Sequence, residues 1–366
     1  MLISPLLSLY IVRNFLLSLG TVFLGFIGVI FLFDTIELLR RAGSSDNISL
    51  GLILQMSLLR LLFLVQQAFP FAVLFGGMIA FWRLTRSREL VVTRSAGVSA
   101  WQFLLPVIFI SAILGALSVT VVNPMASALL AKYERLNASY FEGRSRTLSI
   151  SGSGLWLRQA SLDSRSVIHA PDVRIDGPNV SLTKVTIFVF DGSDTFKSRI
   201  QASNGKLGDG FWHLTDVRIH ESDKPARLVN EYWFETDLTL NNIQDSFSPP
   251  ETMSFWELPA FIANLDKAGF SAIRHRLHWH SLMAIPLLFV GMVLIAAVFT
   301  LRLSARDSTT FIILGGILSG FLLFIFSDIV FALGMRESVP VALAAWTPAG
   351  VCTLLGMSML FHLEDG

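Results

Sequence analysis

Basic residues recur at the ends of apolar segments, in a pattern suited to binding an anion. Arg40 and Arg41 end the first apolar segment, and Lys132 and Arg135 end the third. Guanidinium groups offer a planar fork of donors to phosphate, whereas an ammonium group adds point charge. The topology argued below puts all four at the outer membrane surface, where cations are disfavoured, together with Arg144, Arg146, Arg274 and Arg276. This accumulation favours an anionic ligand such as a phosphorylated lipid head group. Anchoring at the membrane interface is the alternative.

A second group of charged residues lies in the loop "RLTRSRELVVTRSAGVS", residues 83–99. Ser87 predicts the N-cap of a short helix that begins at Arg88, and Gly97 predicts its end. Transporters use a short cytosolic helix between two membrane helices to press on a motor subunit. The alternative is an ordinary basic loop that only keeps this side of the protein in the cytoplasm. The contact residues expected on this coupling helix, near 87–98, are Arg88, Glu89, Leu90 and Arg94.

Signals for catalysis and for metal binding are weak. The chain has no G-x-x-x-x-G-K-[ST] phosphate loop, so ATP must be bound by another chain. The "SGSG" of residues 151–154 is in strand-like sequence rather than at a nucleophile elbow. His275, His278 and His280 have no acidic or thiol neighbour in sequence, so we expect no metal site, no cofactor and no catalytic residue. Asp328 is an acidic residue in an apolar segment, which makes it a functional hypothesis.

The composition excludes a soluble globular protein. Hydrophobic residues make up 53% of the 366 residues, charged residues only 15%, and the mean hydropathy is +0.61. The formal net charge of +1 gives no sign of a nucleic-acid partner. Cys352 is the single cysteine, so an internal disulfide is impossible. We therefore expect an α-helical integral membrane protein.

Six apolar segments predict six transmembrane helices in a three-plus-three arrangement. Three precede the polar stretch 140–250 and three follow it, and each is long enough for a bilayer core of ~30 Å. The basic loops 83–94 and 302–310 are expected to be cytoplasmic, which puts both termini inside. The predicted domains are residues 1–139 with helices one to three, the insert 140–250, and residues 251–366, with an amphipathic connecting helix near 254–270 and helices four to six.

The insert has the pattern of an all-β domain. Residues 184–192, 211–221 and 232–240 alternate with a period near two and are separated by turn signals. About seven short strands fit, as a meander or a two-sheet roll. An unpaired edge, expected along 185–190 and 217–219, would template pairing with another β-domain. The predicted inward residues are Val185, Ile187, Val189, Trp212, Leu214, Val217 and Ile219.

Nearly the whole chain resembles the lipopolysaccharide export permease family, LptF/LptG. The resemblance is carried by "FDTIELLRRAG" at 33–43, "FPFAVLFGG" at 69–77, "SRELVVTRSAGVS" at 87–99 and "GLWLR" at 154–158. The loop motif at 87–99 is the most specific of these, and it is more similar to the LptG branch than to the LptF branch.

The resemblance implies half of a heterodimeric ABC transporter that extracts lipopolysaccharide from the inner membrane and passes it to a periplasmic bridge. The implied partners are an LptF-like permease, the ATPase LptB, and the periplasmic β-jellyroll proteins LptC and LptA. It also implies that the insert is a periplasmic β-jellyroll, that helices one and five form lateral gates, and that the helix with Glu89 docks on the ATPase. The lipid-phosphate roles carry over to Arg40, Arg41, Lys132 and Arg135.

One residue departs from the family pattern, and two other functions remain open. Asp34 stands where the family has a lysine, which points either to a different head-group charge or to a partner cation.

A membrane scaffold that recruits periplasmic proteins is one alternative function, and a mechanotransmitting ABC protein is the other. Co-purification with an ATPase would exclude the scaffold, and lipid retained between helices one and five would exclude the mechanotransmitter. The outer cations favour lipid transport, as do the small-residue faces formed by Gly20, Gly25, Gly28, Gly316 and Gly320.

Overall fold

The chain divides into a membrane unit and a β unit. The computed structural model describes residues 5–43, 49–95, 97, 99–141, 155–160, 164–176, 179–191, 195–208, 210–221, 225–236, 249–267, 271–301 and 309–365. The membrane unit comprises Met1–Tyr133, Pro250–Pro259 and Ile273–Gly366, and the β unit comprises Glu134–Pro249 and Ala260–Ala272. Arg144 and Arg146, two of the cations singled out in the sequence, are outside the described residues.

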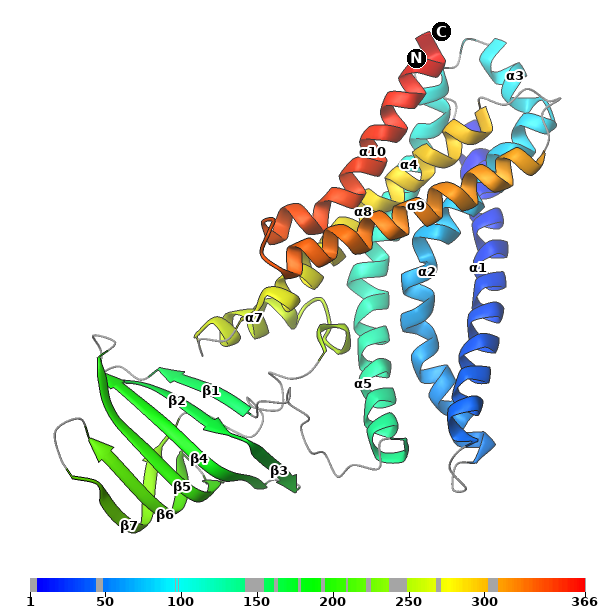
Figure 1. Ribbon diagram of the computed structural model, residues 1–366. Coiled ribbons are helices and arrows are strands. Elements are labelled where there is room, and N and C mark those ends of the chain that lie inside the picture. The colour runs from blue at the N-terminus through cyan, green and yellow to red at the C-terminus, as the bar shows by residue number, and fades with distance from the viewer. Residues whose placement is uncertain are drawn as a thin grey trace. The chain divides into compact units, whose positions relative to one another are not determined.

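Six helical spans in the described part of the chain are long and apolar enough to cross a membrane. Three precede the insert and three follow it, which confirms the predicted arrangement (Figure 1). Ala100–Tyr140 counts as one span built from α4, η1 and α5. The helices are α1 (Pro5–Ala42), α2 (Leu50–Arg86), α3 (Glu89–Ser95), α4 (Ala100–Leu117), η1 (Ser118–Val122), α5 (Asn123–Tyr140), α8 (Ile273–Leu301), α9 (Thr309–Met335) and α10 (Val341–Asp365).

The membrane unit is held by an apolar core to which α1, α2, α4 and α8 contribute. Phe15, Phe81 and Phe289 are fully buried in it. Gly115 of α4 lets that helix lie against α8, because a Cβ at this position would stand 2.5 Å from the Cα of Pro286. Close backbone approach at small residues is how apolar helices gain packing energy without a hydrophobic driving force. Substitution of Gly115 would therefore push α4 away from α8.

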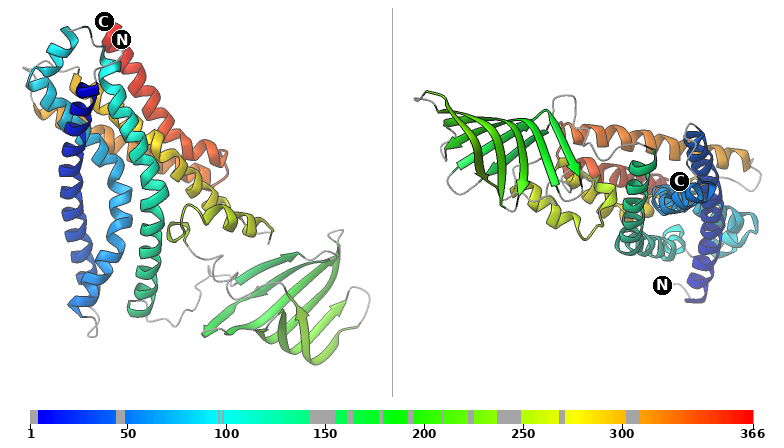
Figure 2. Two further views of the ribbon diagram at one scale, coloured as in Figure 1. Left: turned by 180° about the vertical axis from the view of Figure 1, so that it is seen from behind. Right: turned by 90° about the horizontal axis from the view of Figure 1, so that it is seen from below.

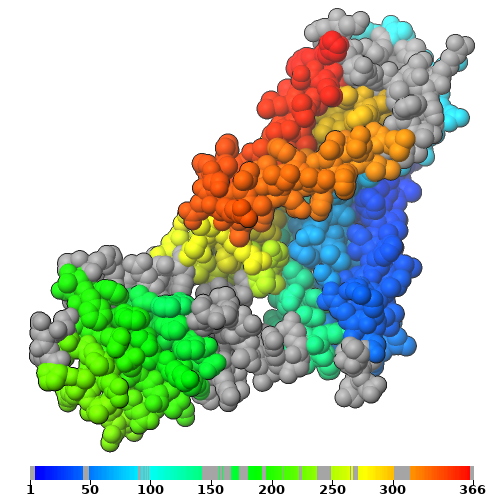
Figure 3. All heavy atoms as spheres, in the orientation of Figure 1, coloured from blue at the N-terminus to red at the C-terminus, as the bar shows by residue number. Residues whose placement is uncertain are grey.

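The least buried spans are α1 and α9. In their most apolar stretches only 17% of the residues are buried, against 56% in α8. Figure 3 shows α9 (orange) lying along the surface. The predicted small-residue faces differ in their packing. Gly316 and Gly320 of α9 pack against Met78 and Phe71 of α2, whereas nothing lies within 4 Å of the Cβ positions of the α1 glycines, Gly20, Gly25 and Gly28.

A π-helical turn, η1, joins α4 to α5. The N–H of Asn123 donates to the carbonyl of Ser118, five residues back, which is the bond that defines such a turn. Two side chains from elsewhere stabilise it: Gln66 Nε2 donates to the Ser118 carbonyl at 3.3 Å, and Trp256 Nε1 donates to the Thr120 carbonyl at 3.2 Å. The Asn123 amide oxygen accepts the N–H of Phe255 at 2.8 Å. The turn is thus fixed by α2 and by the segment that follows the insert.

The described residues of the β unit form one antiparallel sheet of seven strands, which confirms the predicted all-β insert. The sheet order is β1-β2-β4-β5-β6-β7, and β3 also pairs with β4. This order makes β1 and β7 the edges, so the prediction that an edge runs along 185–190 and 217–219 is wrong, because those residues lie in the central strands β4 and β6. The strands are β1 (Leu155–Ala160), β2 (Ser164–Ala170), β3 (Asp172–Asp176), β4 (Asn179–Asp191), β5 (Phe196–Gly208), β6 (Phe211–Glu221) and β7 (Arg227–Glu235).

The sheet is strongly curved (Figure 2), and β1 touches the end of β7 at one residue, Gln159. Gln159 of β1 donates from Nε2 to the carbonyl of Glu235 at 3.1 Å and accepts from Thr236 Oγ1 at 2.7 Å, at the end of β7. The concave side holds the core around Trp212, which is fully buried. Of the residues predicted to face inward, Val185, Ile187, Trp212, Leu214 and Val217 are buried, and Val189 and Ile219 pack against them half-buried.

A crease crosses the sheet where the strand alternation changes phase. The pairs Lys184–Ser203, Ala202–Val217, Ser203–Asp216 and Asp216–Asn230 are missing, and each register is the same immediately before and after this line. Lys184 and Asp216 have positive φ values of 56° and 55°, a conformation uncommon for residues other than glycine. Consecutive buried residues are three positions apart across this line, as in Leu182 and Val185 or Leu214 and Val217. Because neighbouring strands make the same one-residue change, the register is kept on both sides.

Two short elements follow the insert. A 3-10 turn, η2, spans Pro250–Thr252, and the helix α7 spans Leu258–Lys267, within the amphipathic helix predicted for 254–270. Ser254 accepts from the backbone N–H of Glu257, while the Glu257 carboxylate accepts from the N–H of Ser254. This reciprocal pair is a capping box. Ser254 therefore caps the start of this helical segment.

Candidate functional site

The end of α1 carries two of the predicted phosphate-binding residues, which share one carboxylate. Arg40 donates to Glu37 from Nε at 2.9 Å and from Nη2 at 3.0 Å. Arg41 donates to the same carboxylate from Nε at 2.9 Å. The side chains of Arg40 and Arg41 remain 77% and 49% exposed. The three residues together carry a net positive charge, held at the last turn of α1.

Deeper in the same helix pair, Asp34 has found a partner cation. Its Oδ1 accepts from Nη1 of Arg60, on α2, at 3.1 Å. The Arg60 guanidinium also lies over the ring of Tyr133 of α5, 5.3 Å from its centroid, a cation–π arrangement. Beside them, Thr35 Oγ1 donates to Ser57 Oγ at 3.0 Å. Of the two explanations open for Asp34 in the sequence, the structure provides the partner cation.

The predicted cations of the third span lie on α5. Lys132 and Arg135 are both exposed and stand three residues apart, which puts them on one face of the helix. Tyr133, between them in sequence, is buried. The structure therefore brings Arg40, Arg41 and the Asp34–Arg60 pair together on α1 and α2, and links Arg60 to α5 next to Lys132. Of the predicted cations at the start of α8, Arg274 contacts Glu251, with Nη2 to Oε2 at 3.5 Å, and Arg276 is exposed.

Sequence reasoning missed Arg60, although a signal for it exists. Residues 14–33 of α1 contain no charged side chain and end at Asp34, and residues 61–82 of α2 contain none and begin after Arg60. At 1.5 Å per residue each run spans ~30 Å, the thickness of the hydrocarbon core. Asp34 and Arg60 thus stand at the same boundary of two neighbouring spans.

At the opposite end of α2, the predicted short helix is present as α3. Its start differs from the prediction: Ser87 ends α2, because its N–H bonds to the carbonyls of Arg83 and Thr85 and its hydroxyl donates to Leu84. Arg88 follows with φ of 59°, which turns the chain before α3 begins at Glu89. Gly97, with φ of 85°, lies two residues after the end of α3. Leu90 and Arg94 belong to α3, but the description does not extend to their side chains.

Glu89 is half-buried beside a cavity of about 300 Å³. The cavity lies where α3 meets α1, α2 and α4, and its lining is mostly apolar. Within the described residues, Glu89 makes no ion pair. Val92, one helical turn along, is 66% exposed. The helix thus exposes an apolar side chain next to a half-buried acidic one, and the coupling role expected of Glu89 stays a prediction. The residues that line the cavity are Leu7, Tyr10, Ile11, Leu84, Ser87, Glu89, Val92, Thr93 and Phe103.

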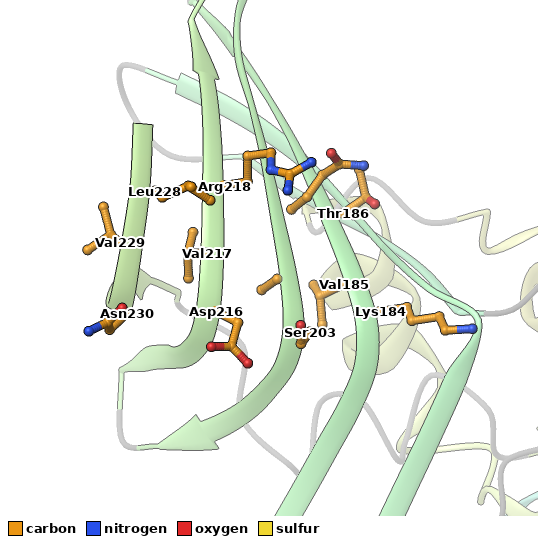
Figure 4. A pocket seen from close by; sticks show the side chains of 12 residues that line it. Lys184, Val185, Thr186, Ser203, Asp216, Val217, Arg218, Leu228, Val229 and Asn230 are labelled. Carbon is orange, nitrogen blue, oxygen red and sulfur yellow. The ribbon is translucent and has the colours of Figure 1, made fainter. Parts of the chain in front are cut away.

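A second, larger cavity of about 560 Å³ follows the crease of the sheet (Figure 4). Its polar side chains come from four neighbouring strands, and Lys184, Asp216 and Arg218 give it mixed charge. It can therefore hydrogen-bond to a polar partner but has no dominant sign of charge. Neither this cavity nor the described remainder of the chain contains a group of three or more His, Cys, Asp or Glu residues able to hold a metal ion.

Comparison with known proteins agrees with the architecture. The family model described as lipopolysaccharide export system permease LptF/LptG matches residues 9–362. The chain is 23% identical over 308 residues to the lipopolysaccharide export system permease protein LptG of Escherichia coli strain K12, covering 81% of this chain and 82% of that protein. It is 24% identical over 294 residues to LptG of Haemophilus influenzae, covering 78% of each. With its six membrane spans and inserted β-sheet, the chain belongs to the LptF/LptG family of lipopolysaccharide export permeases.

Proposed function

We propose that this chain is the LptG-like permease subunit of an ABC transporter that extracts lipopolysaccharide from the inner membrane and passes it to a periplasmic bridge. The observation that carries the proposal is the cation cluster formed by Arg40, Arg41 and Arg60 at the end of the uncharged runs of α1 and α2. Cations at the level of lipid head groups are suited to phosphate. The anchoring alternative needs no such cluster from two helices.

The orientation follows from the basic loops. The stretch from the last turn of α2 through α3 carries Arg83, Arg86, Arg88 and Arg94, which the positive-inside bias puts in the cytoplasm. The start of α1 and the end of α10 lie at the same end of the membrane unit as α3 (Figure 1). Both termini are then cytoplasmic, and the cation cluster and the β unit belong to the periplasmic side.

A second permease, of the LptF type, would pack against the open faces of α1 and α9. These spans are the least buried, and large apolar side chains such as Leu24 and Phe321 are 69% and 59% exposed on them. The open Cβ positions at Gly20, Gly25 and Gly28 suit close helix approach. Such faces can also open sideways to admit a lipid, which supports their role as lateral gates.

The two remaining kinds of partner, an ATPase and periplasmic β-domains, would bind on opposite sides of the membrane. An ATPase of the LptB type would receive α3, with Glu89 and Val92 as contacts, because this chain has no nucleotide-binding loop. Periplasmic β-domains such as LptC and LptA would pair with β1 or β7, which are the sheet edges. Leu228 and Trp233 are 74% and 56% exposed on β7, and an exposed apolar edge is a template for strand addition.

The test is lipid release from proteoliposomes containing the purified complex. Lys132→Glu with Arg135→Glu reverses two exposed cations on α5, and we expect normal assembly, basal ATPase activity and lipid release reduced by about tenfold or more, since each charged contact contributes ~1.5–3 kcal/mol. Lys132→Arg with Arg135→Lys keeps the charge and is the matched control. Correct assembly with normal release in the reversed variant would overturn the phosphate role. Poor assembly with normal specific activity would favour interfacial anchoring.

A further inference from the structure

Arg60 differs from the other arginines at its end of the membrane unit in which of its nitrogens are engaged. Arg40 uses Nε and Nη2, the two donors on one edge of its guanidinium, to hold Glu37. Arg41 also commits its Nε to Glu37. Arg60 bonds Asp34 through Nη1 alone, and within the described residues its Nε and Nη2 make no hydrogen bond. That edge carries the two parallel donors that match a phosphate.

The position of this free edge is fixed at two points. Asp34 has a side chain only 5% exposed, so it can hold Nη1 while water hardly competes. Tyr133 is buried and offers its ring to the flat face of the same guanidinium. The Arg60 side chain remains 30% exposed. A side chain held on one corner and one face and open on one edge loses little conformational entropy when a ligand binds that edge.

The Asp34–Arg60 pair is also poorly arranged for stability alone. The second carboxylate oxygen of Asp34, Oδ2, is buried without a hydrogen-bond partner among the described residues. A buried charge with an unsatisfied oxygen offsets much of the gain from the ion pair. Removing the guanidinium would leave the carboxylate uncompensated, whereas a second anion at the free edge leaves the existing bond intact.

We propose that Arg60 is a further residue for binding a lipid phosphate, and that Asp34 and Tyr133 position it. The proposal rests on the proposed function and deepens it, because it assigns the two-donor contact to α2 rather than to the last turn of α1. The ligand group is a phosphate monoester at the membrane surface. A lipid head group supplies it at the level where the uncharged runs of both helices end.

The experiment compares lipopolysaccharide with the same lipid treated with phosphatase, bound to the purified transporter complex in nanodiscs. Arg60→Gln with Asp34→Asn replaces the ion pair by two amides that can still bond each other. We expect the affinity for the phosphorylated lipid to fall about tenfold, which corresponds to 1.4 kcal/mol, and the affinity for the treated lipid to stay unchanged. Thr21→Val is the control on the same helix as Asp34, because Thr21 donates only to Leu17 of its own helix, and it should bind both lipids as the unaltered complex does.

Two single variants separate ligand binding from a purely structural pair. Arg60→Lys keeps the charge but has no donor edge, so it should also lower the affinity for the phosphorylated lipid selectively, and it serves if the double variant fails to assemble. Asp34→Asn keeps an oxygen that can accept from Nη1 of Arg60 and leaves the donor edge free, so the affinity for the phosphorylated lipid should fall much less than in Arg60→Lys. A purely structural pair predicts instead that Asp34→Asn is as damaging as the loss of Arg60.

The inference is overturned if the double variant binds both lipids normally or loses both equally. If Arg40→Glu with Arg41→Glu then still removes the preference for phosphorylated lipid, only the role of Arg60 is wrong. If that variant also keeps the preference, the proposed phosphate site fails as a whole. Inorganic phosphate alone, added at the concentration of the lipid phosphate, tests the other source of the same group. Displacement of the lipid by it would overturn the assignment to a lipid.

Discussion

The two ends of the α1–α2 helix pair handle charge in opposite ways. At the Arg60 end, Asp34 and Glu37 hold three arginines within the chain, at distances of 2.8–3.1 Å. At the α3 end, no ion pair forms among the described residues: Arg86 lies over the ring of Trp82, 5.2 Å from its centroid, and Glu89 makes no ion pair. The difference teaches that one end is preorganised by the chain itself, as a small ligand requires, whereas at the other end Glu89 has no ion-pair partner among the described residues, as the proposed contact with an ATPase requires.

The largest effect is expected from reversing both cations of the last turn of α1. Arg40→Glu with Arg41→Glu places three acidic side chains where Glu37 now holds two arginines. Two lost phosphate contacts at ~1.5–3 kcal/mol each predict a loss of lipid affinity of more than 100-fold, measured as lipid-stimulated ATPase activity and release in proteoliposomes. Arg40→Lys with Arg41→Lys is the control. An assembled complex with intact release would show that the Arg60 end of the helix pair binds no phosphate.

A smaller but clear effect is expected at the α3 end. Glu89→Lys reverses the acidic residue at the start of α3, and the loss of a charge-assisted contact with the ATPase costs ~2–5 kcal/mol. We expect the ATPase to be lost during purification. Glu89→Gln keeps the side-chain shape beside the cavity and should weaken the complex less. A Glu89→Lys complex that survives high salt with full ATPase activity would mean that this end needs no partner charge.

The smallest effect is expected from the hydrogen bond that joins α1 to α2 at the Arg60 end of the helix pair. Thr35→Val removes the hydrogen bond from Thr35 to Ser57, which ties α1 to α2 beside Asp34. A net loss of ~1 kcal/mol should lower the midpoint of thermal unfolding by about 2 °C. Thr21→Val is the matched control, because Thr21 donates only to Leu17 of its own helix. Equal midpoints for the two variants would show that the contact between the helices adds no stability.

Patterns local in sequence predicted most of the fold. Long apolar runs identified the six spans, alternation identified the strands around Trp212, and charge density identified α3. The prediction for Ser87 was wrong because the same hydroxyl can cap a helix start or bond back to the preceding turn, and the positive φ of Arg88 decided between them. The crease was missed because alternation with a period of two does not reveal a one-residue phase change, such as that between Leu214 and Val217.

Residues far apart in sequence account for the part of the site that was missed. Asp34 and Arg60 are 26 positions apart, and Tyr133 follows much later. A lone arginine beside an apolar run is ordinary in a membrane helix, so only the packing of α1 on α2 revealed that it meets Asp34. The exposed cations Arg40, Arg41 and Lys132 were predictable because their positions at the ends of spans are local.

The π turn η1 determines which face of α5 is directed toward α2. A π turn contains one more residue than an α-helical turn, and each residue of an α-helix rotates the chain by about 100° about the helix axis. If the turn rewound to α geometry, the helix beyond it would rotate about its axis by roughly that angle, and Tyr133 would leave Arg60. The turn is held by Gln66 and by Trp256, which lies just after the insert. The segment that follows the β unit therefore helps to fix the rotation of α5 about its axis, and with it the direction in which Lys132 faces.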